Sequence, residues 1–109
     1  MSRTFLYTEV QASVPFAHFD WGQANPSIKQ APGLINKTWL SGIGNNSLGG
    51  LYLFETEDDA LAFARGPFAE EARRAGAAAT TRIFDAEIVA AASADLGSPF
   101  FTAQQNANP

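Results

Sequence analysis

Cysteine is absent from this chain, and basic residues are few. Without cysteine the protein has no disulfide, no thiolate nucleophile and no cysteine-bound iron–sulfur or zinc site. Lys and Arg together number seven against eleven Asp and Glu, which gives a formal net charge of -4. Nucleic acids and anionic membranes are bound by clustered cations that replace counterions, so we expect neither as a partner.

Long apolar runs are also missing. No window reaches the ~20 apolar residues that a membrane span needs, and the first ten residues lack the charged and then apolar pattern of a secretion signal. These features predict a soluble cytoplasmic protein. Hydrophobic residues make up 46% of the 109 positions and aromatic residues 12%, so we expect one domain with a modest core.

The common nucleotide, hydrolase and protease motifs do not occur. The glycines fit neither G-x-x-x-x-G-K-[ST] nor G-x-G-x-x-G, and there is no G-x-S-x-G or H-E-x-x-H. The acidic pairs Asp58-Asp59 and Glu70-Glu71 are typical of solvated helix faces. We therefore expect no metal site.

The stretch from residue 32 to residue 54 predicts two antiparallel strands joined by a turn. Alternation over 34–40 places Lys37 and Trp39 with Ile35 on one face, and Leu34 and Asn36 on the other. Residues 41–48 are rich in glycine, asparagine and serine, which favour a reversal of the chain. Residues 50–54 then return as the second strand.

The segments before the hairpin predict a further strand and a helix. Residues 4–14 alternate as a strand. His18 and Trp21 fall in a loop or first turn, followed by a short helix with Asn25 as N-cap and Pro26 at its first position.

After the hairpin, Thr56 and Asp59 form a capping pattern that begins a helix, and Gly66-Pro67 is predicted to break it. A second helical piece over 68–75 ends at Gly76. Residues 80–89 are predicted to form the last strand. A helical turn at 90–94 opens a polar tail, so we divide the chain into a domain at 1–90 and a C-terminal tail at 91–109.

The resulting order, β-α-β-β-α-β, predicts a ferredoxin-like α+β fold with a four-stranded antiparallel sheet. Its helices cover one face of the sheet. The other face would be an exposed apolar patch, so we expect a second copy to cover it in a homodimer.

Four segments, PGLINKTWLSG, GGLYLF, ETEDDALAF and TTRIFD, resemble in order and spacing the YdhR-type monooxygenases of the dimeric α+β-barrel superfamily. The resemblance covers roughly residues 3–89. It implies a homodimer whose sheets pack face to face, and a pocket between each sheet and its own helices. The superfamily includes oxygenases that need no metal or flavin and act on phenolic or polyketide-like substrates, besides isomerases and haem-degrading enzymes.

Two residues are candidates for catalysis. His18 is the only imidazole and could act as a base near pH 7, although a lone histidine in a turn is also a common surface or capping residue. Arg82 lies in a strand between apolar neighbours and could hold an anionic substrate or an enolate. The more common role of such a residue is a structural ion pair, here with Glu9, Asp85 or Glu87.

The candidates for substrate binding are mostly aromatic. Lys37, like Arg82, could hold an anionic substrate or form a structural ion pair with Glu9, Asp85 or Glu87. Trp39 and Tyr52 could form a stacking wall or belong to the core or the dimer interface. The full set is Trp21, Lys37, Trp39, Tyr52, Phe63 and Phe84.

The leading hypothesis is a cofactor-independent monooxygenase that binds a small aromatic or polyketide-like compound between sheet and helices. Two alternatives remain open at this point. One is a non-catalytic protein that binds a small hydrophobic ligand, and the other is an isomerase or acid–base enzyme of the same fold.

Overall fold

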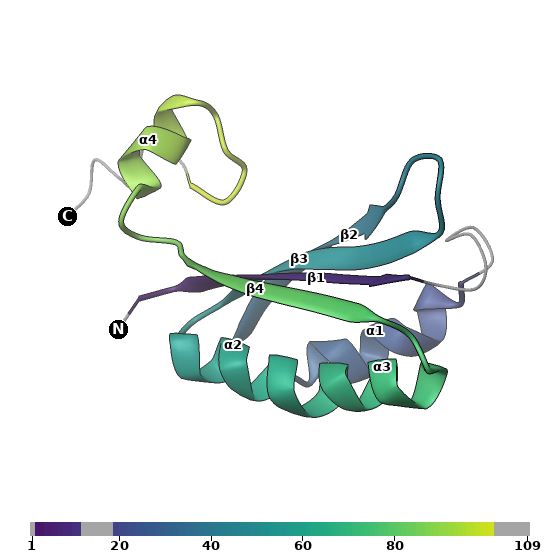
Figure 1. Ribbon diagram of the computed structural model, residues 1–109. Helices are drawn as coiled ribbons and strands as arrows, with labels where there is room; N and C mark the ends of the chain where they lie inside the picture. The colour runs from purple at the N-terminus through teal and green to yellow at the C-terminus, as the bar shows by residue number, and fades with distance from the viewer. Residues whose placement is uncertain (1, 12–18, 102–109) are drawn as a thin grey trace.

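The computed structural model describes residues 2–11 and 19–101, which form one antiparallel sheet with helices on both sides (Figure 1). The strand order is β2-β3-β1-β4. This arrangement confirms the predicted ferredoxin-like α+β class. The elements, in chain order, are β1 (Thr4–Gln11), α1 (Trp21–Lys29), β2 (Leu34–Ser41), β3 (Ser47–Phe54), α2 (Glu57–Phe63), the π-helical turn η2 (Ala64–Phe68), α3 (Ala69–Ala75), β4 (Ala79–Asp85) and α4 (Ala90–Asp95).

The two faces of the sheet differ in their cover. Helices α1, α2 and α3 lie against one face, which we call the helix face, and α4 lies on the other, the open face (Figure 1). On the helix face, Leu6 and Phe54 are fully buried and form a core with Tyr52 and with Phe63 of α2. Burial of these side chains provides the main hydrophobic stabilisation of the sheet against α2.

A β-bulge interrupts β2 near its start. Leu34 pairs with Phe54, but the next pair is Asn36 with Leu53, so Ile35 is an extra residue in this strand. Because of it, Leu34 packs against the helix-face core, and Lys37 lies on the same face, opposite Tyr52. The predicted separation of Asn36 from Lys37 is correct, whereas the predicted separation of Leu34 from Lys37 is wrong.

Helices α2 and α3 are joined through η2 into one continuous rod (Figure 1). Thr56 is the N-cap, and its hydroxyl accepts a hydrogen bond from the Asp59 backbone N–H at 3.1 Å, as predicted. Gly76, with a φ of 63°, ends the rod, also as predicted. The predicted break at Gly66-Pro67 is wrong, because the wider π-helical turn accommodates the proline ring and its missing N–H.

Helix α1 begins earlier than the sequence pattern indicates. Its N-cap is Asp20, whose carboxylate accepts a hydrogen bond from the Gln23 backbone N–H at 3.3 Å. Pro26 therefore lies inside the helix, and the predicted start at Asn25 is wrong. Asn25 uses its side chain for a tertiary hydrogen bond instead, and no residue of α1 is fully buried.

The chain after β4 folds back over the open face. Phe101 is 3% exposed and packs with Leu53, Ala86 and Ala90. The ring of Phe5 meets the ring of Phe100 edge-on, with 5.2 Å between centroids. The predicted helical turn is confirmed as α4, and the packed structure extends to residue 101. The division of the chain at residue 90 remains a prediction.

Candidate active site

The ammonium group of Lys37 lies between two aromatic rings on the helix face. Its Nζ atom is 3.1 Å from the centroid of the Trp39 indole and 4.5 Å from the centroid of the Tyr52 ring. The strands dictate this grouping, because Lys37 pairs with Tyr52 across β2 and β3 and Trp39 is two residues further along β2. Aromatic faces attract cations, so the two rings hold the amine between them.

No carboxylate of the described residues forms an ion pair with Lys37, whose side chain is half-buried. Burial therefore lowers the pKa of Lys37 from 10.5 to about 7, because the charged form loses its hydration. The ring faces favour the ammonium and oppose this shift. The amine can thus exist in both protonation states near neutral pH.

Gly50 provides the space that the Lys37 side chain occupies. A Cβ atom at Gly50 would lie 2.4 Å from Cε of Lys37 and 3.2 Å from Cε1 of Tyr52. Any other residue here would push the amine out of its place. Sequence reasoning missed this role, although a glycine inside a strand is a known sign that another group approaches closely.

The two aromatic walls are held by different helices. The indole Nε1–H of Trp39 donates to Oδ1 of Asn25 in α1 at 3.0 Å, and the Phe19 ring lies 5.4 Å from the indole centroid. Tyr52 packs against Phe63 of α2, with 5.0 Å between ring centroids. Lys37 therefore lies between one ring that is held from α1 and another that is packed by α2.

The hydroxyl of Tyr52 is hydrogen-bonded to the side chain of Thr8, which is 1% exposed. Burial raises the pKa of Tyr52 to about 12, and the hydrogen bond to Thr8 opposes the rise only in part. Tyr52 stays protonated over the physiological range. It can donate a hydrogen bond but cannot compete with Lys37 as a base.

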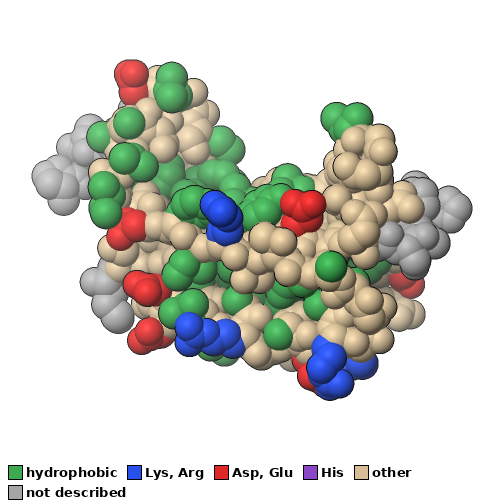
Figure 2. Space-filling model, viewed as in Figure 1, with side chains coloured by type: hydrophobic (Ala, Val, Ile, Leu, Met, Phe, Trp, Pro, Cys, Tyr) green, Lys and Arg blue, Asp and Glu red, His purple; other side chains and the backbone are tan. Residues whose placement is uncertain are grey.

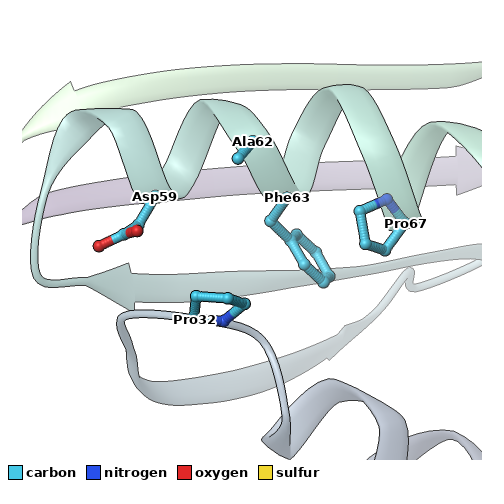
Figure 3. Close-up of a pocket in the computed structure, with 5 residues that line it drawn as sticks. All are labelled: Pro32, Asp59, Ala62, Phe63 and Pro67. Atoms are coloured by element: carbon cyan, nitrogen blue, oxygen red, sulfur yellow. The ribbon is translucent and has the colours of Figure 1, made fainter.

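Phe63, which packs against Tyr52, also lines a hollow of about 120 Å³ between α2 and the residues that precede β2, whereas Lys37, Trp39 and Tyr52 do not line it (Figure 3). The ring of Phe63 points toward Pro32 across it, Asp59 stands at one end and Pro67 at the other (Figure 3). Typical ligand pockets measure ~300–1,000 Å³, so this hollow accepts only part of a ring system.

The open face contains a second hollow, of about 180 Å³, at the foot of the β2–β3 turn. Tyr7 and Ser47 line it, and both donate to the Glu9 carboxylate, at 2.6 and 3.2 Å. The hydrogen bond to Glu9 raises the pKa of Tyr7. Figure 2 shows apolar side chains lining the depressed surface between α4 and this turn.

The structure brings together four of the residues predicted for the site: Lys37, Trp39, Tyr52 and Phe63. Trp21 is 54% exposed at the start of α1. Arg82 and Phe84 pair with Tyr7 and Phe5 of β1 and so lie on the open face, away from Lys37.

His18 lies outside the described residues. The residues that the sequence did not indicate are Thr8, Phe19, Asn25 and Gly50. Asp85 and Glu87, the structural partners considered for Arg82, are otherwise engaged. Glu87 forms an ion pair with Arg3, and the Asp85 carboxylate accepts from the Glu87 backbone N–H at 2.7 Å.

The described part of the chain has neither a cluster of metal ligands nor a membrane-spanning helix. It contains no group of three histidine, aspartate or glutamate side chains that could hold a metal ion. Among its helices, none has the length and hydropathy that crossing a bilayer demands.

The strand order, the helices on one face and the aromatic-walled amine beneath them define a small ferredoxin-like α+β protein with a candidate site between sheet and helices. Residues 6–94 match the family described as "Putative mono-oxygenase ydhR". The chain belongs to this monooxygenase family. No curated protein matches it in sequence.

Solved structures share the fold. SnoaB from Streptomyces nogalater, a cofactor-independent oxygenase, is 17% identical with a TM-score of 0.58, and the match covers 80% of this chain and 95% of SnoaB. The ActVA-Orf6 monooxygenase of Streptomyces coelicolor, in complex with Nanaomycin D, is 12% identical with a TM-score of 0.56, covering 77% and 87% of the two chains. At these identities the similarity establishes the fold.

Proposed function

We propose that this protein is a cofactor-independent monooxygenase of the cytoplasm that oxidises a small aromatic or polyketide-like compound beside Lys37. The observation that carries the proposal is a half-buried amine between two aromatic rings, with no carboxylate of the described residues ion-paired to it. Membership of a monooxygenase family supports it, as does the shared fold with SnoaB, a cofactor-independent oxygenase.

Lys37 acts first as a base in this scheme. Its neutral amine takes the proton from a phenolic hydroxyl or from a methylene group activated by a neighbouring carbonyl. The ammonium that forms then stabilises the substrate anion. The Tyr52 hydroxyl, which stays protonated, is a hydrogen-bond donor for that anion.

The substrate anion itself reduces dioxygen, so no other reductant enters. In sum, an activated methylene and one dioxygen molecule give a ketone and one water molecule. The carbanion forms a C–O bond to dioxygen, and the resulting peroxide loses its remaining α-hydrogen as a proton while the O–O bond breaks. One oxygen atom becomes the carbonyl and the other leaves as hydroxide, which the Lys37 ammonium protonates to water.

Substrate entry requires the helix face to open at α1. This helix buries no residue completely, and it contacts the site through the hydrogen bond from Trp39 to Asn25. Moving α1 away from α2 would expose the Trp39 side chain, and it would also withdraw Ile28 from the core around Phe63. We therefore place substrate entry between these two helices.

We also propose that two copies pair through their open faces. Phe84 and Leu40, on the two edge strands of that face, are 49% and 37% exposed, and Figure 2 shows apolar side chains on the surface between α4 and the β2–β3 turn. A second copy offers the same surface and can cover it by two-fold symmetry. Arg82 and Phe84 then belong to the interface and not to the site.

Oxygen uptake tests the first proposal. The protein is mixed with a panel of anthrones and hydroquinones, with a chelator and without flavin, and product mass is followed under oxygen-18 gas. We expect uptake with one labelled oxygen atom in the product, and a loss of at least about 100-fold for Lys37→Met, the size typical of a catalytic acid or base. Lys29→Met, at the exposed end of α1, is the matched control.

Full turnover by Lys37→Met would remove this residue from the mechanism. Tight ligand binding without oxygen uptake would refute oxygenation in favour of a binding protein, and a product of unchanged mass would favour an isomerase. For the dimer, sedimentation at micromolar concentration should give twice the chain mass for the natural protein and the single mass for Phe84→Glu. A natural protein that sediments as one chain would exclude the pairing.

A further inference from the structure

The chain contains only two lysines, and they lie in opposite surroundings. Lys29 is exposed in the last turn of α1. Lys37 is half-buried on the helix face between the Trp39 and Tyr52 rings, with Gly50 leaving space for its side chain. An amine that is partly removed from water, with no ion-paired carboxylate among residues 2–11 and 19–101, is in the kind of environment where lysine becomes a nucleophile.

We propose that Lys37 is a nucleophilic amine that forms an imine with small aromatic aldehydes and ketones held between the sheet and α1. This activity goes beyond oxygenation, in which Lys37 only exchanges a proton. It uses the same atom, but it needs neither dioxygen nor an acidic substrate.

The position of Nζ supports the chemistry. The Trp39 and Tyr52 rings enclose the amine in an apolar setting and hold Nζ at one place on the helix face. Burial also lowers the pKa of Lys37 to about 7, so a large fraction of the amine is neutral at physiological pH. An ordinary exposed lysine is neutral in only about one molecule in a thousand or fewer at that pH.

The reaction balances without any oxidant or reductant. The amine nitrogen adds to the carbonyl carbon, and the carbonyl oxygen leaves as water with the two amine protons, so that one carbonyl compound and one amine give one imine and one water molecule. The imine is reversible. Cyanoborohydride traps it by delivering hydride to the imine carbon, and a proton from water completes the secondary amine.

The experiment uses the full chain with benzaldehyde and cyanoborohydride at pH 7. Peptide mass spectrometry then compares labelling at Lys37, at Lys29 and at the N-terminal amine in the same molecules. We expect Lys37 to be labelled about tenfold more than Lys29, because the larger neutral fraction outweighs its partial burial and lower basicity. The preference should fall as pH approaches 10, where ordinary lysines also lose their protons.

A glycine variant tests the geometry. Gly50→Ala places a methyl group 2.4 Å from Cε of Lys37 and displaces the amine, so the preference should fall toward that of an exposed lysine. Gly66→Ala is the matched control, because a Cβ there meets no atom within 4 Å, and its preference should stay unchanged. If Gly50→Ala does not fold, the pH dependence of the Lys37 to Lys29 labelling ratio in the natural protein tests whether Lys37 is an activated amine.

A Lys37 to Lys29 ratio below about tenfold at pH 7 would overturn the proposal, since ordinary reactivity would explain it. Equal ratios in folded Gly50→Ala and Gly66→Ala would overturn it as well. Oxygen uptake does not enter these measurements. Imine formation and oxygenation can therefore fail independently.

Discussion

Replacing Lys37 by methionine should stabilise the protein below neutral pH and have little effect at alkaline pH. The ammonium of Lys37 is unfavourable in the folded state, because burial lowers its pKa from 10.5 to about 7. Below pH 7 both folded and unfolded chains are protonated, and the penalty is fully present. Between pH 7 and about 10.4 the unfolded chain binds more protons, so stability rises with pH until both states are neutral.

The size of the effect follows from the shift. The full pKa shift of Lys37 corresponds to a change of at most ~5 kcal/mol in the free energy of unfolding. Lys37 is only half-buried, and the Trp39 and Tyr52 faces recover part of the cost, so we discount the figure to about 2 kcal/mol. Methionine has a similar length and no charge, and fills the same slot between the rings.

Urea unfolding followed by circular dichroism at pH 6, 8 and 10 measures this difference, at one fixed protein concentration. We expect Lys37→Met to be more stable than the natural protein by about 2 kcal/mol at pH 6 and by less than about 1 kcal/mol at pH 10, where the unfolded lysine has begun to lose its proton. Lys29→Met should show no such trend. A difference that is the same at all three pH values, or a destabilised variant at pH 6, would refute the account of a desolvated amine.

Three further predictions concern the frame around the site. Thr56→Ala should cost about 1 kcal/mol in urea unfolding by removing the α2 N-cap, and an unchanged midpoint would contradict the cap. Phe101→Ala should cost about 3 kcal/mol, because its ring is buried against the open face; a loss below ~1 kcal/mol would mean that this segment does not dock. Asn25→Ala should cost about 1 kcal/mol and alter Trp fluorescence, because Trp39 loses its hydrogen-bond acceptor. Asn25→Asp keeps that acceptor and should change neither. Equal fluorescence spectra for the two variants would count against this hydrogen bond.

Much of the fold could be predicted because its signals are local. The Thr56 cap and Gly76 are predicted from neighbouring residues and hold in the structure, as does the alternation of β2 beyond the bulge at Ile35. The errors arise where distant contacts override local rules. Pro26 lies inside α1, which Asp20 caps and Asn25 links to the sheet, and Pro67 lies inside a π-helical turn. The interpretation of both prolines as boundaries assumed regular α-helical hydrogen bonding.

The candidate site was predictable in part. Lys37, Trp39 and Tyr52 come together because one hairpin carries all three, and the register of a hairpin follows from its own residues. Arg82 and Phe84 belong to β4, whose register depends on pairing with β1, about 75 residues away in sequence. Which face they occupy cannot be derived from their own strand, so the sequence could not separate them from Lys37.

The π-helical turn between α2 and α3 holds one residue more than regular helical winding would. Removing Gly66 should therefore leave an unbroken α-helix in which Ala72 still points inward, because four residues at about 100° each turn the chain about as far as five in the wider turn. Removing a residue from the regular part of α3 before Ala72 should instead rotate everything beyond it by about 100° and turn Ala72 away from its buried position. The alignment of this rod with the sheet thus tolerates a deletion in the π-helical turn and not in the regular helix beside it.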